Sequence, residues 1–166
     1  MGARPSKPRF LADAMCGRVC KWLRMLGYDC LYPGDLPDEE LLQIALREGD
    51  RILVTRDREL YRKALSRGLR AFLVRHSTIE ESLAELSAAY GVKLSIDPDD
   101  SRCPLCNARI RRAGRGEVRG LPPEILERYG EFWVCTGCGN VYWKGSHYKT
   151  MERILGNARR IRSLLV

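Results

Sequence analysis

The sequence lacks a hydrophobic segment long enough to cross a membrane. Its apolar residues make up 45% of 166 positions, but they fall in short runs, whereas a spanning helix needs roughly 18–20 consecutive apolar residues. The basic start, residues 1–9, is followed by an apolar run at residues 10–12 that is too short for the core of a signal peptide. We therefore expect a cytoplasmic protein with no membrane association, in which residues 1–9 form a basic, disordered leader.

Histidine is scarce, and internal repeats and low-complexity tracts are absent. The chain has only two histidines, so its chemistry is expected to need no imidazole. The lone His147 can serve a structural role as well as contact a substrate.

Net charge is absent from the first hundred residues, which contain equal numbers of basic and acidic side chains. The whole excess of +8 lies in residues 101–166. Such a concentration of positive charge is typical of proteins that bind a polyanion. Solubility alone is the simpler alternative.

Apolar runs and helical patterns alternate along residues 10–97. Expected strands lie at residues 9–12, 30–32, 51–55 and 71–74, and expected helices at 14–26, 38–47, 58–66 and 78–89. Repeated strand–helix units with short loops predict a doubly wound parallel sheet, the α/β class. The polar segment 97–101, which contains a proline, predicts the end of this domain.

Four of the seven cysteines form two CxxC pairs in the second part of the chain, Cys103 with Cys106 and Cys135 with Cys138. Four thiolates at tetrahedral geometry favour a closed structural Zn²⁺ site, over a redox dithiol or an iron centre. We expect a zinc ribbon over residues 101–147 and a basic amphipathic helix over 148–166. Cys16 and Cys20 are expected to be small, partly buried residues rather than metal ligands.

Acidic residues open three of the expected helices. Asp13 and Asp57 each follow an apolar strand, and Asp38 opens the helix between them. In a parallel sheet such positions lie together at the carboxyl edge, where carboxylates can hold Mg²⁺ or Mn²⁺. Each aspartate is equally explained as a helix N-cap, and spacing alone leaves both interpretations open.

Several segments resemble the PIN-like ribonuclease family named for the C-terminal region of the exonuclease Mut-seven. The resemblance rests on residues 10–29, on Asp38-Glu-Glu-Leu-Leu, on Ile52-Leu-Val-Thr-Arg-Asp57-Arg-Glu-Leu, and on residues 131–147 around the second cysteine pair. It covers the chain from Phe10 to about Met151. It implies a PIN-like parallel sheet flanked by helices, a C-terminal zinc ribbon and a metal-dependent nuclease.

The resemblance also implies catalytic roles. Asp13 and Asp57 match the family's acids after the first and third strands, and Asp38 matches the acid that opens the intervening helix, although Glu39 or Glu40 could serve. Glu59 stands where related chains often have a further acid. We therefore expect Mg²⁺ or Mn²⁺ at Asp13, Asp38 and Asp57 and hydrolysis of RNA phosphodiester bonds, with Thr55 orienting Asp57 or a metal-bound water.

Basic and aromatic residues are the expected RNA contacts. The tryptophans and tyrosines of residues 133–148 can stack on unpaired bases or pack the zinc module. A noncatalytic RNA-binding assembly or maturation factor, or an adaptor for a protein partner, would share these features, and the oligomeric state stays open. The basic and histidine contacts expected are Arg18, Lys21, Arg24, Arg56, Arg58, Lys144, His147, Arg159 and Arg160.

Overall fold

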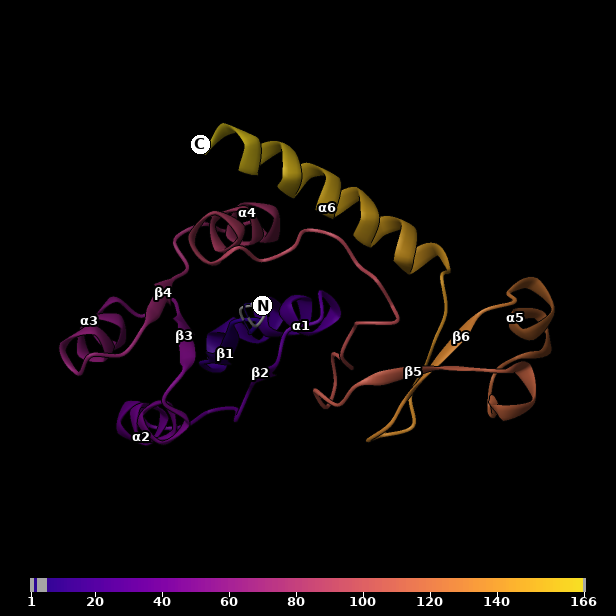
Figure 1. Cartoon of the computed structure of the whole chain (residues 1–166), viewed down its shortest axis with the longest axis horizontal. Coiled ribbons are helices and arrows are strands. Elements are labelled where there is room, and N and C mark those ends of the chain that lie inside the picture. Colours follow the sequence, from indigo (N-terminus) through magenta and orange to yellow (C-terminus); the bar gives the residue numbers. More distant parts are fainter. Residues whose placement is uncertain (1, 3–5, 166) are drawn as a thin grey trace.

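A four-stranded parallel sheet forms the centre of the molecule, seen in a computed structural model that describes residue 2 and residues 6–165 (Figure 1). The strand order is β2-β1-β3-β4, and every neighbouring pair is parallel. The predicted α/β class is confirmed. The strands are β1 (Arg9–Ala12), β2 (Cys30–Leu31), β3 (Arg51–Thr55) and β4 (Ala71–Leu73).

Helices connect the strands and cover both faces of the sheet. Alternate strand residues point to opposite faces of the sheet. Phe10 and Ile52 join the core beneath α1, α4 and the last helix, α6 (Ser146–Leu164), whereas Leu11 and Leu53 join the core beneath α2 and α3. Figure 1 shows α4 and α6 above the strands and α2 below them. The helices of this part are η1 (Ala14–Cys16), α1 (Gly17–Met25), α2 (Asp38–Glu48), α3 (Arg58–Ser66) and α4 (Ile79–Tyr90).

A small antiparallel sheet with the order β5-β6-β7 follows, beyond the β2 edge of the large sheet. Phe132 and Trp133 on its central strand are buried and supply its core. Its elements are β5 (Ile110–Ala113), η2 (Arg115–Glu117), α5 (Pro123–Arg128), β6 (Phe132–Cys135) and β7 (Val141–Tyr142).

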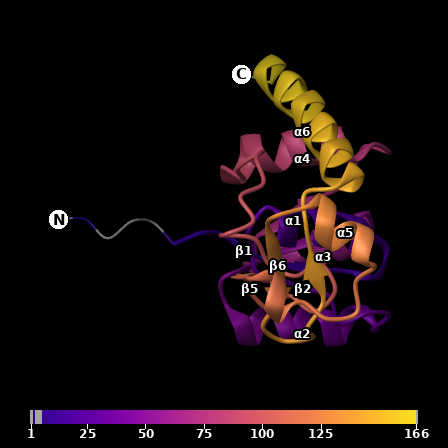
Figure 2. The same cartoon turned by 90° about the vertical axis from the view of Figure 1, so that its right-hand side faces the viewer.

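The last helix, α6 (Ser146–Leu164), returns to the large sheet instead of extending from the small one. It packs along α4 (Figure 2), and its Leu155 and Ala158 are fully buried in the core that also contains α1 and α4. The apolar face predicted for this helix is therefore the face that completes the α/β core. No helix in the described part of the chain is long and apolar enough to cross a membrane.

The first cysteine turn docks on the amino end of β2. The Asn107 amide donates to the Asp29 carboxylate at 2.8 Å and accepts the Cys30 N–H at 3.2 Å, while Arg24 donates to the carbonyls of Cys30 and Pro104 at 2.9 Å each. Asn107 has a φ of 71°, a left-handed conformation that asparagine tolerates better than most residues. These bonds fix the small sheet against the large one.

The expected disordered leader, residues 1–9, falls partly outside the described residues. Within its described part, Arg9 belongs to β1, and Lys7 donates to the Gly27 carbonyl and pairs with Asp100. The chain is therefore in contact with the folded part from Lys7 onward.

Candidate active site and metal centre

Asp13 and Asp57 come together at the carboxyl ends of the adjacent strands β1 and β3. The hydroxyl of Thr55 donates to Asp13 Oδ2 and accepts the backbone N–H of Asp57 at 3.0 Å. The Asp13 N–H also donates to the Val54 carbonyl at 3.0 Å. This fully buried hydroxyl therefore links the two acidic positions. It orients the carboxylate of Asp13, whereas its contact with Asp57 is to the backbone.

Both aspartates also cap helices. Asp13 Oδ1 accepts the N–H of Met15 at 3.0 Å, and Asp57 Oδ1 accepts the N–H groups of Glu59 and Leu60 at 2.8 and 3.2 Å. Within the described residues, the second oxygen of Asp57 has no hydrogen-bond partner. Capping therefore leaves that oxygen available for a further ligand.

Asp38 and Glu59 converge on a lysine. Lys63 Nζ lies 3.6 Å from Asp38 Oδ2 and 3.5 Å from Glu59 Oε1. The neighbouring acid Glu39 is bound by Arg67 through two hydrogen bonds of 2.8 Å. Lys63 is not among the predicted site residues, although its spacing of four residues from Glu59 is the usual one for an ion pair on a helix.

The predicted three-aspartate cluster is not compact. Among the described residues, the four paired cysteines are the only group of three or more metal-binding side chains whose ligand atoms all lie within 4.8 Å of one another. Asp13 and Asp57 are linked through Thr55, whereas Asp38 pairs with Lys63.

A buried thiol lies beside Asp13. Burial, reinforced by the charge of Asp13, raises the pKa of Cys16 to about 12, so this side chain stays a neutral thiol at physiological pH. Cys16 is fully buried, more completely than the partly buried side chain that the sequence predicts. The nearby Tyr32 hydroxyl donates to the Ala14 carbonyl at 2.7 Å and holds the turn after Asp13.

Exposed arginines flank Asp57. A groove of about 340 Å³ beside it is lined by Arg58, Tyr61, Arg62 and Arg75, together with Leu73. None of these three arginines forms a salt bridge with another described residue. Arg56 is also exposed and donates to the His76 carbonyl at 3.0 Å. Positive charge without a protein partner is therefore concentrated next to the acidic edge.

Arg24 does not suit its predicted contact with RNA. Its side chain is buried, and its guanidinium is engaged by the Cys30 and Pro104 carbonyls. Its place on the inner face of α1, against the first cysteine turn, makes it a structural residue. The remaining predicted contacts are exposed: Arg18, Lys21, Arg56, Arg58, Lys144, His147, Arg159 and Arg160.

The four cysteine sulfurs form a second, separate centre. Cys103 Sγ lies 3.7 Å from Cys138 Sγ, and Cys106 Sγ lies 3.3 Å from Cys135 Sγ. Burial opposes ionisation of Cys135, but N–H groups of Cys138 and Gly137 donate to its sulfur and lower its pKa to about 6. The thiolate form of Cys135 is thus favoured, whereas, despite backbone hydrogen bonds, hydrogen bonding among the neighbouring sulfurs raises the pKa of Cys106 and that of Cys138. The proximity of the four sulfurs shows that the group can hold a metal such as zinc.

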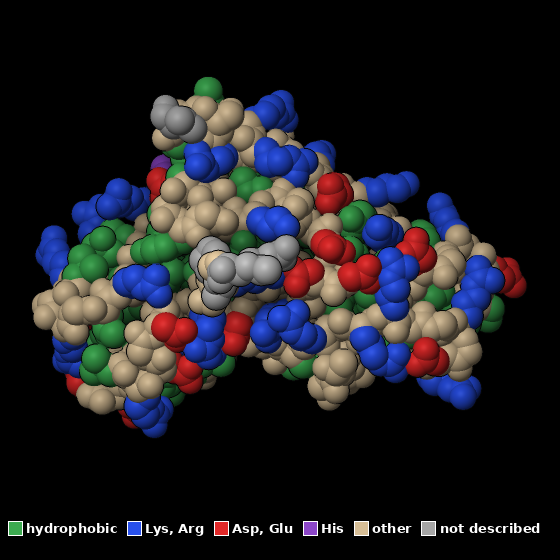
Figure 3. All heavy atoms as spheres, viewed as in Figure 1, with side chains coloured by type: hydrophobic (Ala, Val, Ile, Leu, Met, Phe, Trp, Pro, Cys, Tyr) green, Lys and Arg blue, Asp and Glu red, His purple; other side chains and the backbone are tan. Residues whose placement is uncertain are grey.

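The cysteine centre and the acidic pair lie at different ends of the large sheet. Asn107, beside the first cysteine turn, contacts Asp29 just before β2, whereas Asp13 follows the end of β1. The five residues of β3 correspond to about 16 Å between these edges. Figure 3, viewed from the side on which the chain enters β1, shows basic and acidic side chains interspersed.

Comparison with known proteins decides the family. The Mut7-C RNAse domain model matches residues 8–155, which include the acidic edge, both cysteine pairs and most of α6. The chain belongs to the Mut7-C RNAse domain family. The resemblance noted in the sequence is therefore confirmed. Neither the curated proteins nor the solved structures contained a match to this Mut7-C chain.

Proposed function

We propose that this Mut7-C protein is a metal-dependent ribonuclease that hydrolyses RNA phosphodiester bonds at the carboxyl edge of β1 and β3. The observation that carries the proposal is the Asp13–Thr55–Asp57 arrangement at the ends of adjacent strands, in which one buried hydroxyl donates to the Asp13 carboxylate and accepts the backbone N–H of Asp57. Membership of an RNAse domain family supports the reaction class.

The donor set suits Mg²⁺ or Mn²⁺. Carboxylate oxygens are the preferred ligands of these ions, and Mg²⁺ is commonly held by one or two carboxylates together with substrate phosphates. Asp13 and Asp57 meet that requirement without a compact third acid. Asp38 and Glu59, both paired with Lys63, would join only after the lysine moves away.

Each residue then has a distinct task. Asp13 and Asp57 hold the ion, and Thr55 orients the Asp13 carboxylate through its hydrogen bond. Arg56, Arg58 and the neighbouring arginines of the groove bind backbone phosphates. When bound there, the ion would supply a water of lowered pKa and would stabilise negative charge on the phosphate.

The cysteine centre is proposed to hold structural Zn²⁺. Four sulfur ligands close the coordination sphere and leave no position for substrate. The exposed Lys144, His147, Arg159 and Arg160 are proposed to extend the RNA-binding surface over this module and α6. Arg18 and Lys21 on the exposed face of α1 would continue it.

A calorimetric titration tests the proposed function. Zinc-loaded protein is titrated with Mn²⁺ as wild type, as Asp13→Asn and as Asp50→Asn, an exposed acid at the opposite edge. We expect saturable binding in wild type and Asp50→Asn, and a loss of tenfold or more in Asp13→Asn, the order of magnitude expected for removal of a metal ligand. Cleavage of single-stranded RNA should follow the same order.

A noncatalytic RNA-binding factor is the competing function, because both aspartates already serve as helix caps. It would bind RNA equally well with Asp13→Asn, and no Mn²⁺ binding would appear in wild type, with or without RNA. That result would overturn the nuclease proposal.

A further inference from the structure

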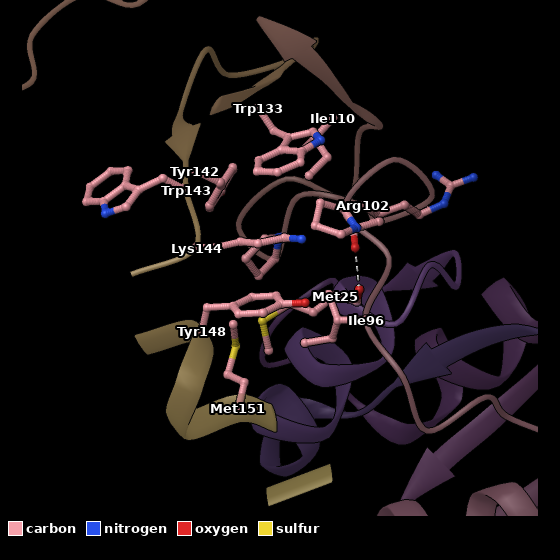
Figure 4. Close-up of a pocket in the computed structure, with 13 residues that line it drawn as sticks. Met25, Ile96, Arg102, Ile110, Trp133, Tyr142, Trp143, Lys144, Tyr148 and Met151 are labelled. Carbon is pink, nitrogen blue, oxygen red and sulfur yellow. Dashed lines mark hydrogen bonds between the residues drawn. The ribbon is translucent and has the colours of Figure 1, made fainter. Parts of the chain in front are cut away.

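A second cavity, of about 90 Å³, lies where the small sheet, α6 and the end of α1 meet (Figure 4). Its walls are almost entirely apolar and aromatic. Trp133 comes from β6, Tyr148 from the first turn of α6, and Met25 from the end of α1. The residues that define it are Trp133, Tyr142, Lys144, Tyr148, Met25 and Ile96.

Two aromatic rings face a single ammonium group in this cavity. Lys144 Nζ lies 5.8 Å from the ring centre of Trp133 and 5.4 Å from that of Tyr148. Figure 4 shows the lysine side chain extending between the two rings. No carboxylate of the described residues lies within salt-bridge distance of Lys144. The cavity therefore presents flat apolar walls and an exposed cation, Lys144, that lacks a carboxylate partner. The second cation of the lining, Arg102, donates to the Asn107 carbonyl at 2.9 Å.

We propose that this cavity binds one unpaired nucleobase of an RNA strand, with Lys144 binding the adjoining phosphate. Aromatic side chains stack on bases of any sequence, and a nearby cation binds the backbone. The Trp133 indole N–H is already bound by Asp99 at 2.9 Å, and its ring is only 1% exposed. Trp133 therefore forms the floor of the cavity, and the half-buried ring of Tyr148 is the stacking surface offered. The proposal depends on RNA being the ligand in the proposed function and names a separate contact for it.

The base pocket would be an anchor remote from the reacting phosphate. Met25 is the last residue of α1, while Asp13 and Cys16 precede the first. The nine residues of this helix separate the two positions by roughly 13 Å. A strand anchored by one base would therefore reach Asp13 through nucleotides further along the chain, over the exposed face of α1 that contains Arg18 and Lys21.

Fluorescence of 2-aminopurine tests the pocket without relying on cleavage. Oligouridylates that each contain one 2-aminopurine are titrated with zinc-loaded full-length protein in the Asp13→Asn background, with no added Mn²⁺. When the pocket residues are unchanged, we expect the fluorescence to be quenched for one preferred position of 2-aminopurine in the oligonucleotide. Tyr148→Leu should abolish that quenching and weaken binding on the order of tenfold, within the range for loss of one base–aromatic stack.

Lysine variants supply the matched control. Lys144→Gln and Lys149→Gln each remove one positive charge from neighbouring exposed positions, but only Lys144 lines the cavity. We expect Lys144→Gln alone to alter the quenching. These variants also keep the test decisive if Tyr148→Leu does not fold, as judged by zinc content and circular dichroism.

Three results would overturn the proposal: no quenching at any position, unchanged quenching in Lys144→Gln, or equal effects of the two lysine variants. A cavity that instead receives an apolar side chain of a protein partner gives the first result. Quenching in the absence of Mn²⁺-dependent cleavage by the wild-type protein would retain the base pocket and reject the nuclease, so the two proposals fail separately.

Discussion

A buried hydroxyl at Thr55 connects the two acids that matter most to the proposed function. This hydroxyl donates to the Asp13 carboxylate and accepts the backbone N–H of Asp57, and the side chain is inaccessible to solvent. Such a group sets the orientation of a carboxylate before any ligand arrives. Its contribution to activity should therefore exceed its contribution to stability.

Thr55→Val preserves the shape of the side chain but removes this hydrogen bonding. We expect a loss of about 10–100-fold in Mn²⁺ affinity or kcat, as for other residues that orient metal ligands. The free energy of unfolding should fall by about 1–2 kcal/mol because the Asp57 N–H loses its acceptor. Enzyme kinetics and urea denaturation measure the two effects. Thr55→Ser keeps the hydroxyl and should retain most activity; equal losses in both variants would contradict the orienting role.

Lys63 competes with any cation for Asp38 and Glu59. Lys63→Met removes the competing ammonium, so we expect tighter Mn²⁺ binding if these acids belong to the site. Stability should change by less than about 1 kcal/mol, since the pairs are solvent-exposed. Calorimetry of Lys63→Met beside Arg67→Met, which frees Glu39 instead, separates a local effect from a general gain in negative charge. Unchanged affinity would remove Asp38 and Glu59 from the metal site.

At the scale of elements, the docking of the first cysteine turn on β2 depends on a polar network. Arg51 donates to Asp29 at 2.8 and 3.2 Å, and Asn107 donates to the same carboxylate. Burial opposes ionisation of Asp29, but these hydrogen bonds outweigh it and hold its pKa below the usual range. The charged form of Asp29 therefore stabilises the contact between the two sheets.

The stability contributed by Asp29 should depend on pH. Because its folded-state pKa is depressed, the contribution is complete well above its unfolded pKa of about 3.9 and declines as pH falls below that value. Asp29→Asn should cost about 2 kcal/mol near neutrality, within the range for hydrogen bonds to charged groups. Denaturation of the wild type and of Asp29→Asn at several pH values gives the difference in their free energies of unfolding. Any release of zinc by acid affects both proteins alike and cancels in this difference. A pH-independent difference would contradict this account, and Asp50→Asn is the exposed control.

The helix α6 has an apolar face in the core and an exposed basic face. Its apolar face completes the core against α4 and α1, so truncating it would expose that core. Its basic face includes the exposed Arg160, whose guanidinium donates to Asn157 within the same helix. Arg159 is less free, because its guanidinium donates to the Leu94 carbonyl. A substitution of Arg159 can therefore change both RNA binding and the free energy of unfolding, so both quantities have to be measured.

At the scale of the molecule, the module that contains the two cysteine pairs is attached at both of its ends. Its first cysteine turn is fastened to β2 by Asn107 and Arg24, and its last strand leads into α6, which is part of the core. Loss of the metal should therefore lower the stability of the whole chain and not only that of the ribbon.

Removing zinc tests this connection. We expect one zinc ion per chain, and its chelation should lower the midpoint of thermal unfolding and shift the emission of the buried Trp133, because a small module of this kind depends on its metal to fold. Cys106→Ser should reproduce both effects, whereas Cys20→Ser, outside the metal centre, should not abolish zinc binding. Unchanged emission and midpoint after chelation would contradict a structural role.

Local patterns in the sequence determined much of the architecture. The apolar run of β3, the acids at helix starts and the glycines after helices specify where elements begin and end, because those preferences act over a few residues. The spacing of Cys103, Cys106, Cys135 and Cys138 likewise specified a metal-binding group. Asp13 and Asp57 were placed together by topology alone, since β1 and β3 are neighbouring parallel strands.

Only the tertiary structure decided which partners the polar side chains have. Arg24 has the same charge as Arg18, yet packing buries the first beneath a cysteine turn and leaves the second exposed. Lys63 pairs with Asp38, a predicted metal ligand, and with Glu59, a predicted catalytic acid. The helix α6 completes the α/β core. These outcomes depend on contacts between residues distant in the chain, and the free energy of a buried or paired charge is set by those neighbours, not by local sequence.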